Sequence, residues 1–322
     1  MAPTGFERMN ELGSRSKPFL FIIDFDLLKP LVYNPEEALD HGILYQIHGN
    51  RNYETASPEA IQFTFGKTPI LPEEYNHSFE LVMDHIKAGN TYLVNLTCPT
   101  MIETELSLRE IFFRSQARYK LLMPNDFVVF SPEIFIQITD GLISSNPMKG
   151  TIDAAIPDAA SRLLGNPKEL AEHHTIVDLI RNDLNIVAKH VRVERFRYLE
   201  EITTNFTKLL QVSSMITGIL PHDYNSHIGD ILYRMLPAGS VTGAPKKRTV
   251  EIIREAETYN RGYYTGIMGY FDGKNLDSGV MIRFIEENPS GKIFKSGGGI
   301  TSQSNANEEY QEMIDKVYVP FA

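Results

Sequence analysis

The sequence predicts an α+β fold in which mixed, mostly antiparallel sheets lie beside helices. Apolar segments of strand length recur along the chain, and the turn dipeptide Asp140-Gly141 separates two of them. Apolar residues over 75–87 recur instead at helical spacing. The 322 residues contain no internal repeat, low-complexity tract or obvious linker. Strand and helix patterns combined in this way are typical of an α+β architecture.

The first part of the chain shows mainly strand and loop patterns. Residues 19–24 form an apolar run that predicts a short buried strand, and the region up to Pro72 is expected to be strands and loops. A helix follows over 75–87, and Gly89 is placed to cap its carboxyl end. Residues 91–96 then predict another strand.

The middle of the chain predicts three strands of a meander, over 127–130, 134–139 and 142–146. If Asp140-Gly141 is the whole loop of the second hairpin, the antiparallel register brings Glu133 opposite Met148. Glu133 would then lie one residue from Lys149, at the roughly 5–8 Å typical of cross-strand neighbours.

The last part of the chain alternates helix and strand signals. Asn166 is a helix N-cap, followed by proline at the first helical position and Glu169 at the third, and this helix is expected to reach about Lys189. A final helix is expected from near Asn305 to near Val319. Strands are predicted between these two helices, over 266–271, 276–285 and 292–296.

Composition excludes several classes of protein. Acidic residues outnumber basic ones by 41 to 31, giving a net charge of −10, and no basic stripe is present, so nucleic acid is not expected as a partner. Cys98 is the only cysteine, which excludes an intrachain disulfide. The first residues lack an apolar export segment and the longest apolar stretches are strand-sized, so we expect a cytoplasmic protein with no membrane partner.

Lys149 is the first candidate for chemistry. It stands between Met148 and a tight Gly150-Thr151 turn, at the end of an extended segment. A lysine amine that is held away from water can lose its proton near neutral pH and attack carbon. An ordinary surface lysine, or a structural salt bridge with Glu133, would give the same pattern. Ideal strand pleating would also put the two side chains on opposite faces, unless Pro147 breaks the alternation.

Two helices carry paired carboxylates. Glu169 and Glu172 are three residues apart on the first of these helices, and Glu309 and Glu312 share a flank of the last helix with Lys316. Glutamates from both helices could together hold Mg²⁺, a cation that prefers oxygen ligands. From spacing alone, a capping box at Glu169 and an exposed face with a Glu312–Lys316 pair explain the same residues.

Other segments give weaker signals. Arg283 lies in an apolar predicted strand, so it is expected to pair with the protein or with a ligand carboxylate. The Gly297-Gly298-Gly299 triplet could present backbone N–H groups to an anion. The segment 239–246 fails the phosphate-loop pattern because Ala-Pro intervenes before Lys246, and His173-His174 lacks metal-ligand spacing.

Taken together, these segments resemble the chorismate-utilising enzymes. The matching segments occur in the family's order between about residues 75 and 319. The resemblance implies a chorismate-binding fold with a sandwich-like core flanked by helices. It also implies one enzyme domain over 1–322, with a short strand-rich part over 1–72 and the catalytic core over 73–322. The matching segments are 131–133, 147–151, 171–172, 176–183, 236–246, 261–266, 296–300, 309–312 and Lys316.

Within that family, position 149 separates the branches. Lysine there resembles the aminodeoxychorismate synthase component I branch, also called para-aminobenzoate synthase component I, whereas anthranilate synthases usually carry alanine. Members that add water to chorismate typically have a lysine where this chain has Leu93. The absence of that lysine argues against an isochorismate or salicylate synthase. An anthranilate synthase large subunit, or a catalytically inactive chorismate-binding regulatory subunit, remain the alternatives.

The resemblance implies roles for particular residues. Lys149 would attack the ring of chorismate at C2 while Glu133, as general acid, assists the departure of the 4-hydroxyl. Ammonia from a glutamine amidotransferase subunit would then enter at C4, giving 4-amino-4-deoxychorismate for p-aminobenzoate and folate synthesis. Glu172 and Glu312 would hold Mg²⁺, with Glu169 and Glu309 nearby. The substrate would be bound by Ser240, Tyr264, Arg283, Gly297, Gly298 and Lys316.

Three departures from the family pattern are present. His173-His174-Thr175 replaces a more apolar run in the helix after Glu172. Gln211 stands where many members have histidine, so the activation of C4 does not transfer directly. The amino-terminal region lacks a recognisable tryptophan-binding box, so feedback inhibition by tryptophan is not expected.

Overall fold

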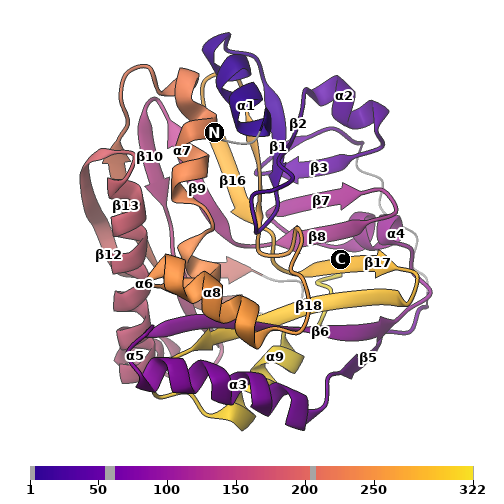
Figure 1. Ribbon diagram of the computed structural model, residues 1–322, viewed down its shortest axis with the longest axis vertical. Coiled ribbons are helices and arrows are strands. Elements are labelled where there is room, and N and C mark those ends of the chain that lie inside the picture. Colours follow the sequence, from indigo (N-terminus) through magenta and orange to yellow (C-terminus); the bar gives the residue numbers. More distant parts are fainter. Residues whose placement is uncertain (1–3, 55–61, 204–207, 322) are drawn as a thin grey trace.

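A computed structural model describes residues 4–54, 62–203 and 208–321, with the backbone alone at positions 149, 168, 202 and 203. Among these residues the strands form two nine-stranded sheets, and every described pairing between named strands is antiparallel. Helices lie beside both sheets (Figure 1). The predicted α+β class is therefore confirmed.

The first sheet carries strands from both ends of the sequence in the order β11-β13-β10-β9-β16-β15-β1-β2, with β12 also pairing with β13. Its strands are β1 (Phe19–Ile23), β2 (Leu31–Tyr33), β9 (Ile134–Thr139), β10 (Leu142–Ser145), β11 (Met148–Asp153), β12 (Lys189–Thr203), β13 (Lys208–Ile219), β15 (Ile267–Phe271) and β16 (Leu276–Val280).

The second sheet has the order β14-β6-β18-β17-β8-β7-β3-β4, with β5 pairing with β6. Its strands are β3 (Leu44–Ile47), β4 (Asn50–Arg51), β5 (Gly66–Pro69), β6 (Leu93–Glu103), β7 (Tyr119–Met123), β8 (Phe127–Ser131), β14 (Gly243–Ala244), β17 (Phe284–Asn288) and β18 (Gly291–Ile300).

The helices cover the outer faces of the sheets. In Figure 1, α3 and α9 lie at the lower end of the molecule beside β6 and β18, and α6 and α7 lie over the other sheet. The helices are α1 (Thr4–Ser14), α2 (Pro35–Asp40), α3 (Pro72–Lys87), α4 (Leu108–Arg114), α5 (Ala159–Gly165), α6 (Pro167–Asn185), α7 (Ile228–Met235), α8 (Lys246–Ala256) and α9 (Ala306–Asp315), with short 3₁₀ turns η1 (Tyr224–His227) and η2 (Gly239–Val241).

The two sheets pack face to face around a shared apolar core. One buried cluster combines Leu20 and Met268 of the first sheet with Leu121 and Val129 of the second. A second cluster packs α1, α6 and α7 on the first sheet, and a third packs α3, α8 and α9 on β6 and β18. The predicted sandwich-like core flanked by helices is confirmed.

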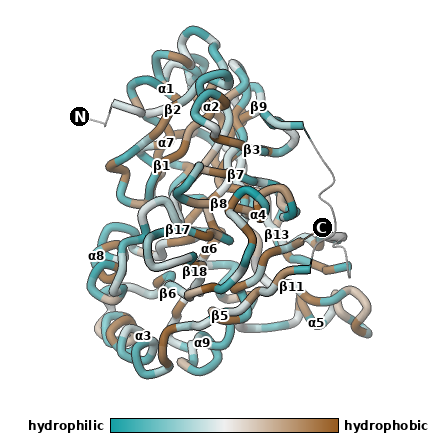
Figure 2. The backbone as a smooth tube through the Cα atoms, turned by 90° about the vertical axis from the view of Figure 1, so that its right-hand side faces the viewer, coloured by the Kyte–Doolittle hydropathy of each residue, from teal (hydrophilic) through white to brown (hydrophobic). Residues whose placement is uncertain are grey.

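Local patterns identify many elements correctly. The β9–β10 hairpin has the predicted register, with Thr139 opposite Leu142, and the predicted helix over 75–87 is most of α3. Hydrophobic and hydrophilic residues alternate along α3 in Figure 2, as expected for an amphipathic helix. Gly89 has a φ of +75° directly after the helix, which fits the predicted cap.

The predicted meander is wrong, because β8 belongs to the second sheet and β9 to the first. The expected pairing of Glu133 with Met148 is wrong as well, because the β9–β10 ladder ends at Ser144 and the chain moves to a new partner. Met148 pairs with Ser213 of β13. The next residue of β9, Ile136, uses its N–H and carbonyl for bonds with the Ser278 hydroxyl, and Pro147 has no N–H with which the ladder could resume.

Several predicted boundaries need correction. The predicted strand over 276–285 is two strands, β16 and β17, because the chain passes there from one sheet to the other. The predicted strand and loop region before Pro72 also contains the helices α1 and α2. The strands predicted over 91–96 and 292–296 extend to Glu103 and Ile300. The helices α6 and α9 end early, at Asn185 and Asp315.

Candidate active site

A cavity of about 660 Å³ opens between the two sheets and the helices α6 and α9. This volume is in the range of small-molecule sites. Eleven predicted site residues line it: Glu133, Glu169, Glu172, Ser240, Tyr264, Arg283, Gly297, Gly298, Glu309, Glu312 and Lys316. The side chain of Lys149 lies outside the described part of the chain, but its neighbours Met148 and Gly150 both line the cavity. The roles of these twelve residues stay predictions.

Glu133 is held where the chain crosses from β8 to β9. Its backbone N–H donates to Ser131 Oγ at 3.1 Å, and its carbonyl accepts from the N–H of Val280 at 3.0 Å. Its carboxylate accepts from Ser240 Oγ, with a distance of 2.6 Å to Oε1. Because Ser240 belongs to η2, this bond joins two walls of the cavity and aims the carboxyl group into it.

The backbone at Lys149 forms a β-bulge. The register with β13 shifts between Lys149, opposite Val212, and Thr151, opposite Gln211. Gly150 is the inserted residue, with a φ of +75° that favours glycine. The expected Gly-Thr turn at a strand end is therefore wrong, since the strand continues to Asp153. A bulge re-aims the side chain beside it, so the face of Lys149 does not follow from strand alternation.

Glu169 lies directly over this bulge. A Cβ atom built on Gly150 would come within 3.2 Å of Glu169 Oε2. The predicted N-cap is confirmed, because the N–H of Glu169 donates to Asn166 Oδ1 at 3.2 Å. Of the two histidines that lack metal-ligand spacing, His173 is buried with its ring against Ser214, at 2.6 Å from Nε2 to Oγ, and His174 is exposed.

Helix α9 supplies a second group of charges. Glu309 is only 5% exposed, and Lys316 Nζ bonds both Glu312 Oε1 at 2.6 Å and the carbonyl of Gly297 at 2.8 Å. Gly298 lies beneath them, since a Cβ built there would lie 3.4 Å from Glu309 Oε2 and 3.7 Å from Glu312 Oε1. This flank of α9 therefore borders the cavity instead of facing only solvent.

The four glutamates fit a hard cation by their donor chemistry, because Mg²⁺ prefers carboxylate oxygens. They line one cavity from α6 and α9. Within the described ranges, however, no three His, Cys, Asp or Glu side chains lie close enough together to hold a metal ion. A bound Mg²⁺ would thus have to draw carboxylates from both helices towards one point.

Hydrogen-bond donors occupy another part of the cavity wall. Tyr264 is 3% exposed, and burial raises the pKa of its phenol, so the hydroxyl stays protonated. Arg283 follows β16 with a φ of +54°, so its predicted place inside a strand is wrong. Among the residues described, its guanidinium meets no carboxylate and lies 5.1 Å from the centre of the Tyr318 ring. It is thus placed to bind an anion.

The glycine triplet lies in β18 beyond the end of β17. Pairing with β17 stops at Lys295, whereas Gly297, Gly298 and Gly299 pair with β6 on the other side. A Cβ on Gly297 would lie 2.2 Å from the carbonyl oxygen of Leu96, so only glycine allows this close approach.

Sequence reasoning missed two ion pairs at the cavity wall: a partly buried one, in which Lys246 pairs with the cavity-lining Asp183, and a fully buried one between Arg261 and Glu257. Lys246 Nζ donates to Asp183 Oδ1 at 2.8 Å and to the carbonyl of Met235 at 2.7 Å, close to η2. Arg261 pairs with Glu257 on the other side. The motifs contained both Lys246 and Arg261, but nothing in the sequence alone showed that their side chains would be buried against backbone carbonyls.

Two further observations concern the chain as a whole. Cys98 is buried and, as predicted, forms no disulfide, and burial raises the pKa of its thiol to about 12. None of the helices formed by the described residues is long and apolar enough to span a membrane.

The family described as chorismate binding enzyme matches residues 33–321. An uncharacterised PabA-like protein of Haemophilus influenzae is 50% identical over 98% of this chain and 95% of its own length. Aminodeoxychorismate synthase component 1 of Escherichia coli is 34% identical, over 95% of this chain and 73% of its own. The crystal structure of anthranilate synthase component I from Streptococcus pneumoniae superimposes with a TM-score of 0.66 and 26% identity, covering 79% of this chain and 58% of that one.

Proposed function

We propose that this chain, which belongs to the chorismate binding enzymes, converts chorismate and ammonia to 4-amino-4-deoxychorismate. The observation that carries the proposal is the single cavity shared by Glu133, the four glutamates and the donors Tyr264 and Arg283, with the Lys149 bulge at its edge. The 34% identity to aminodeoxychorismate synthase component 1 of Escherichia coli supports this choice of reaction.

The wall of hydrogen-bond donors would bind the substrate's enolpyruvyl carboxylate. Arg283, Tyr264 and the backbone at Gly297 and Gly298 line the same cavity, and desolvation strengthens such charge-assisted contacts. Ser240 and Lys316 would fix the other end. When bound by Glu172 and Glu312, with Glu169 and Glu309 nearby, Mg²⁺ would offset the charge of the ring carboxylate.

The chemical steps would use Lys149 and Glu133. The neutral amine of Lys149 forms a bond to C2, the two ring double bonds shift, and the C4–O bond breaks. Glu133 donates a proton, so the hydroxyl leaves as water. Ammonia then bonds to C4, the double bonds shift back and the C2–N bond breaks, which releases Lys149 as an amine. The ammonium group formed at C4 returns its extra proton to Glu133, and the enzyme is restored.

A glutamine amidotransferase subunit would supply the ammonia, and free ammonia should replace it in vitro. The test is to incubate the purified chain with chorismate, Mg²⁺ and an ammonium salt and to separate the products. We expect 4-amino-4-deoxychorismate, which an added lyase converts to p-aminobenzoate. Fluorescent anthranilate formed without any lyase would show an anthranilate synthase instead. Unchanged chorismate would favour an inactive binding subunit.

A further inference from the structure

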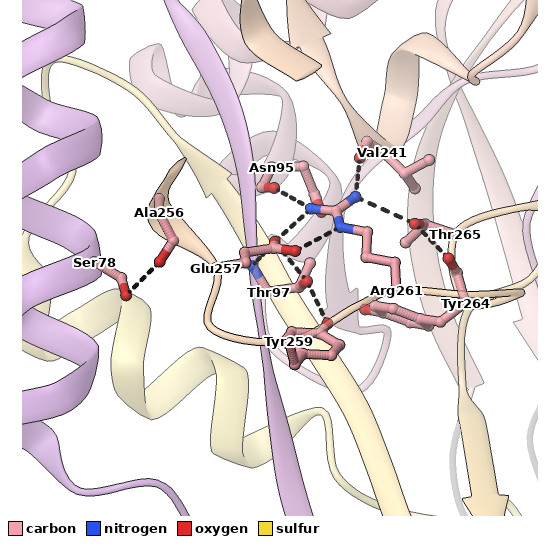
Figure 3. A network of polar contacts seen from close by, with 10 residues as sticks. All are labelled: Ser78, Asn95, Thr97, Val241, Ala256, Glu257, Tyr259, Arg261, Tyr264 and Thr265. Carbon is pink, nitrogen blue, oxygen red and sulfur yellow. Dashed lines mark hydrogen bonds and ion pairs between the residues drawn. The ribbon is translucent and has the colours of Figure 1, made fainter. Parts of the chain in front are cut away.

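Arg261 and Glu257 form a buried ion pair at the centre of a network of polar contacts (Figure 3). Each side chain is 2% exposed. The pair is bidentate, with 2.8 Å from Arg261 Nε to Glu257 Oε2 and 2.6 Å from Nη2 to Oε1. Charged groups this deeply buried need every hydrogen bond satisfied. The acceptors of the three remaining guanidinium N–H groups therefore show what else this side chain holds in place.

The three remaining N–H groups of Arg261 bond to three separate elements. Nη1 donates to the carbonyl of Val241 at 2.8 Å and to Thr265 Oγ1 at 3.2 Å, and Nη2 donates to the carbonyl of Asn95 at 2.7 Å. These acceptors belong to η2, to the segment before β15 and to β6. All five guanidinium donors are therefore used.

Two of the acceptor residues, Val241 and Asn95, line the cavity themselves, and the third, Thr265, follows the cavity residue Tyr264. Val241 follows Ser240, and Asn95 pairs with Gly299 at the end of the glycine triplet. The hydroxyl of Thr265 donates in turn to the carbonyl of Tyr264 at 2.6 Å. Arg261 itself does not line the cavity. One guanidinium thus sets the relative positions of three walls that supply Ser240, Tyr264 and the triplet.

The pair is itself held firmly. Glu257 Oε1 accepts from both the N–H and the hydroxyl of Thr97, at 2.9 and 2.7 Å. The Nζ of Lys295 donates to the carbonyl of Arg261 at 3.1 Å. Ser78 of α3 bonds the carbonyl of Ala256, the residue before Glu257, at 2.7 Å. A small displacement of the guanidinium therefore cannot be absorbed by a loose neighbour.

We infer that Arg261 is a positioning residue, which acts on the substrate through Ser240, Tyr264 and the glycine strand without touching it. A simple ion pair would need only the two bonds to Glu257. The other three bonds each fix one wall, and misplacing a binding group by about 1 Å can lower catalysis on the order of 100-fold. The inference rests on the proposed function in one respect, which is that its test uses chorismate as the ligand.

The test compares three variants by calorimetric binding of chorismate with Mg²⁺, by steady-state kinetics and by thermal unfolding. Arg261→Lys keeps the charge opposite Glu257, but one ammonium cannot reach five acceptors. Thr265→Val removes the hydroxyl that accepts from Arg261 and donates to the carbonyl of Tyr264, and leaves the other bonds of Arg261 in place. Arg254→Lys is the control, because Arg254 lies on α8 outside the cavity and its ion pair with Asp26 is exposed.

We expect Arg261→Lys to remain folded, to bind chorismate about tenfold more weakly and to lose about 100-fold in kcat/KM. Thr265→Val should raise KM severalfold with kcat nearly unchanged, and the control should match the wild type. The inference is wrong if Arg261→Lys and Thr265→Val both keep the wild-type Kd and KM and their kcat falls only in proportion to the folded fraction. Arg261 would then have a structural role alone. A wild type that neither binds nor converts chorismate would instead refute the proposed function.

Discussion

Single side chains in the cavity are fixed by bonds that come from distant parts of the sequence. Glu133 is held by Ser240, and Lys316 links Glu312 to the carbonyl of Gly297. Sequence motifs identified these residues because their types suit the chemistry. The motifs also contain Arg261 and Lys246, but they could not show what these two side chains bond to. Both donate to backbone carbonyls, which carry no sequence signal.

One buried charge outside the cavity gives a prediction for pH. Lys120 is 5% exposed, its Nζ donates to the carbonyl of Ser115 at 2.8 Å, and burial lowers its pKa from 10.5 to about 8. Between pH 8 and pH 10.5, Lys120 is protonated to a greater extent in the unfolded chain than in the folded chain. Raising the pH through this range therefore increases the free energy of unfolding.

We therefore expect the stability of the wild type to rise relative to Lys120→Met between pH 8 and about 10. Urea denaturation of both proteins from pH 7 to pH 10 measures this difference. Lys189→Met, at an exposed position, serves as control and should show no such trend. A stability difference between wild type and Lys120→Met that stays constant with pH would contradict the argument.

At the scale of elements, local patterns succeed where an element stays within one sheet. The β9–β10 register follows from its turn, and α3 follows from its apolar spacing. The patterns fail at two of the places where the chain crosses between sheets, around Pro132 and between Val280 and Phe284. At both crossings only two or three residues, 132–133 and 281–283, separate the strands, and local periodicity contains no information about which sheet a strand joins.

The β18 strand gives a matched pair of glycine variants. Gly297→Ala would place a methyl group 2.2 Å from the carbonyl oxygen of Leu96, and we expect a loss of about 1–3 kcal/mol in stability. Gly298→Ala meets only the ends of flexible side chains, the nearest at 3.4 Å, so its stability should change by less than about 0.5 kcal/mol.

The effect on function should be larger for Gly298→Ala than for Gly297→Ala. The methyl group of Gly298→Ala intrudes beside Glu309 and Glu312, so activity should require more Mg²⁺ for its half-maximal value. Thermal melting and a Mg²⁺ titration of activity test both statements. Wild-type Mg²⁺ dependence in Gly298→Ala would argue against a metal site at these carboxylates.

At the scale of the whole molecule, the two sheets are joined by a shared core and by a polar contact across it. Tyr119 of β7 donates to Asp277 Oδ1 of β16 at 2.6 Å, and Gln137 of β9 donates to Oδ2 at 2.6 Å. The fold and the cavity described above depend on this face-to-face packing. The predicted organisation of residues 1–322 as one domain stays a prediction.

Removing the contact between the sheets should lower stability without changing the chemistry. Tyr119→Phe loses a hydrogen bond to a charged group, so we expect a loss of about 1.5–3 kcal/mol, with unchanged kinetics below the transition because Tyr119 does not line the cavity. Tyr263→Phe is the matched control, since its hydroxyl donates to the exposed, neutral carbonyl of Lys29.

If the chain is a single domain, it should unfold in one transition. Two separated transitions would contradict the one-domain prediction.

The claim on which the mechanism depends is a covalent bond between Lys149 and the substrate ring. The direct measurement is mass spectrometry of the intact protein and its peptides after mixing with chorismate and Mg²⁺, with ammonia withheld. We expect a chorismate-derived adduct on the peptide that contains Lys149. In Lys149→Ala the adduct should be absent, chorismate affinity mostly kept and kcat lower on the order of 10³-fold. An alanine variant that still forms the aminated product at the wild-type rate would contradict the mechanism.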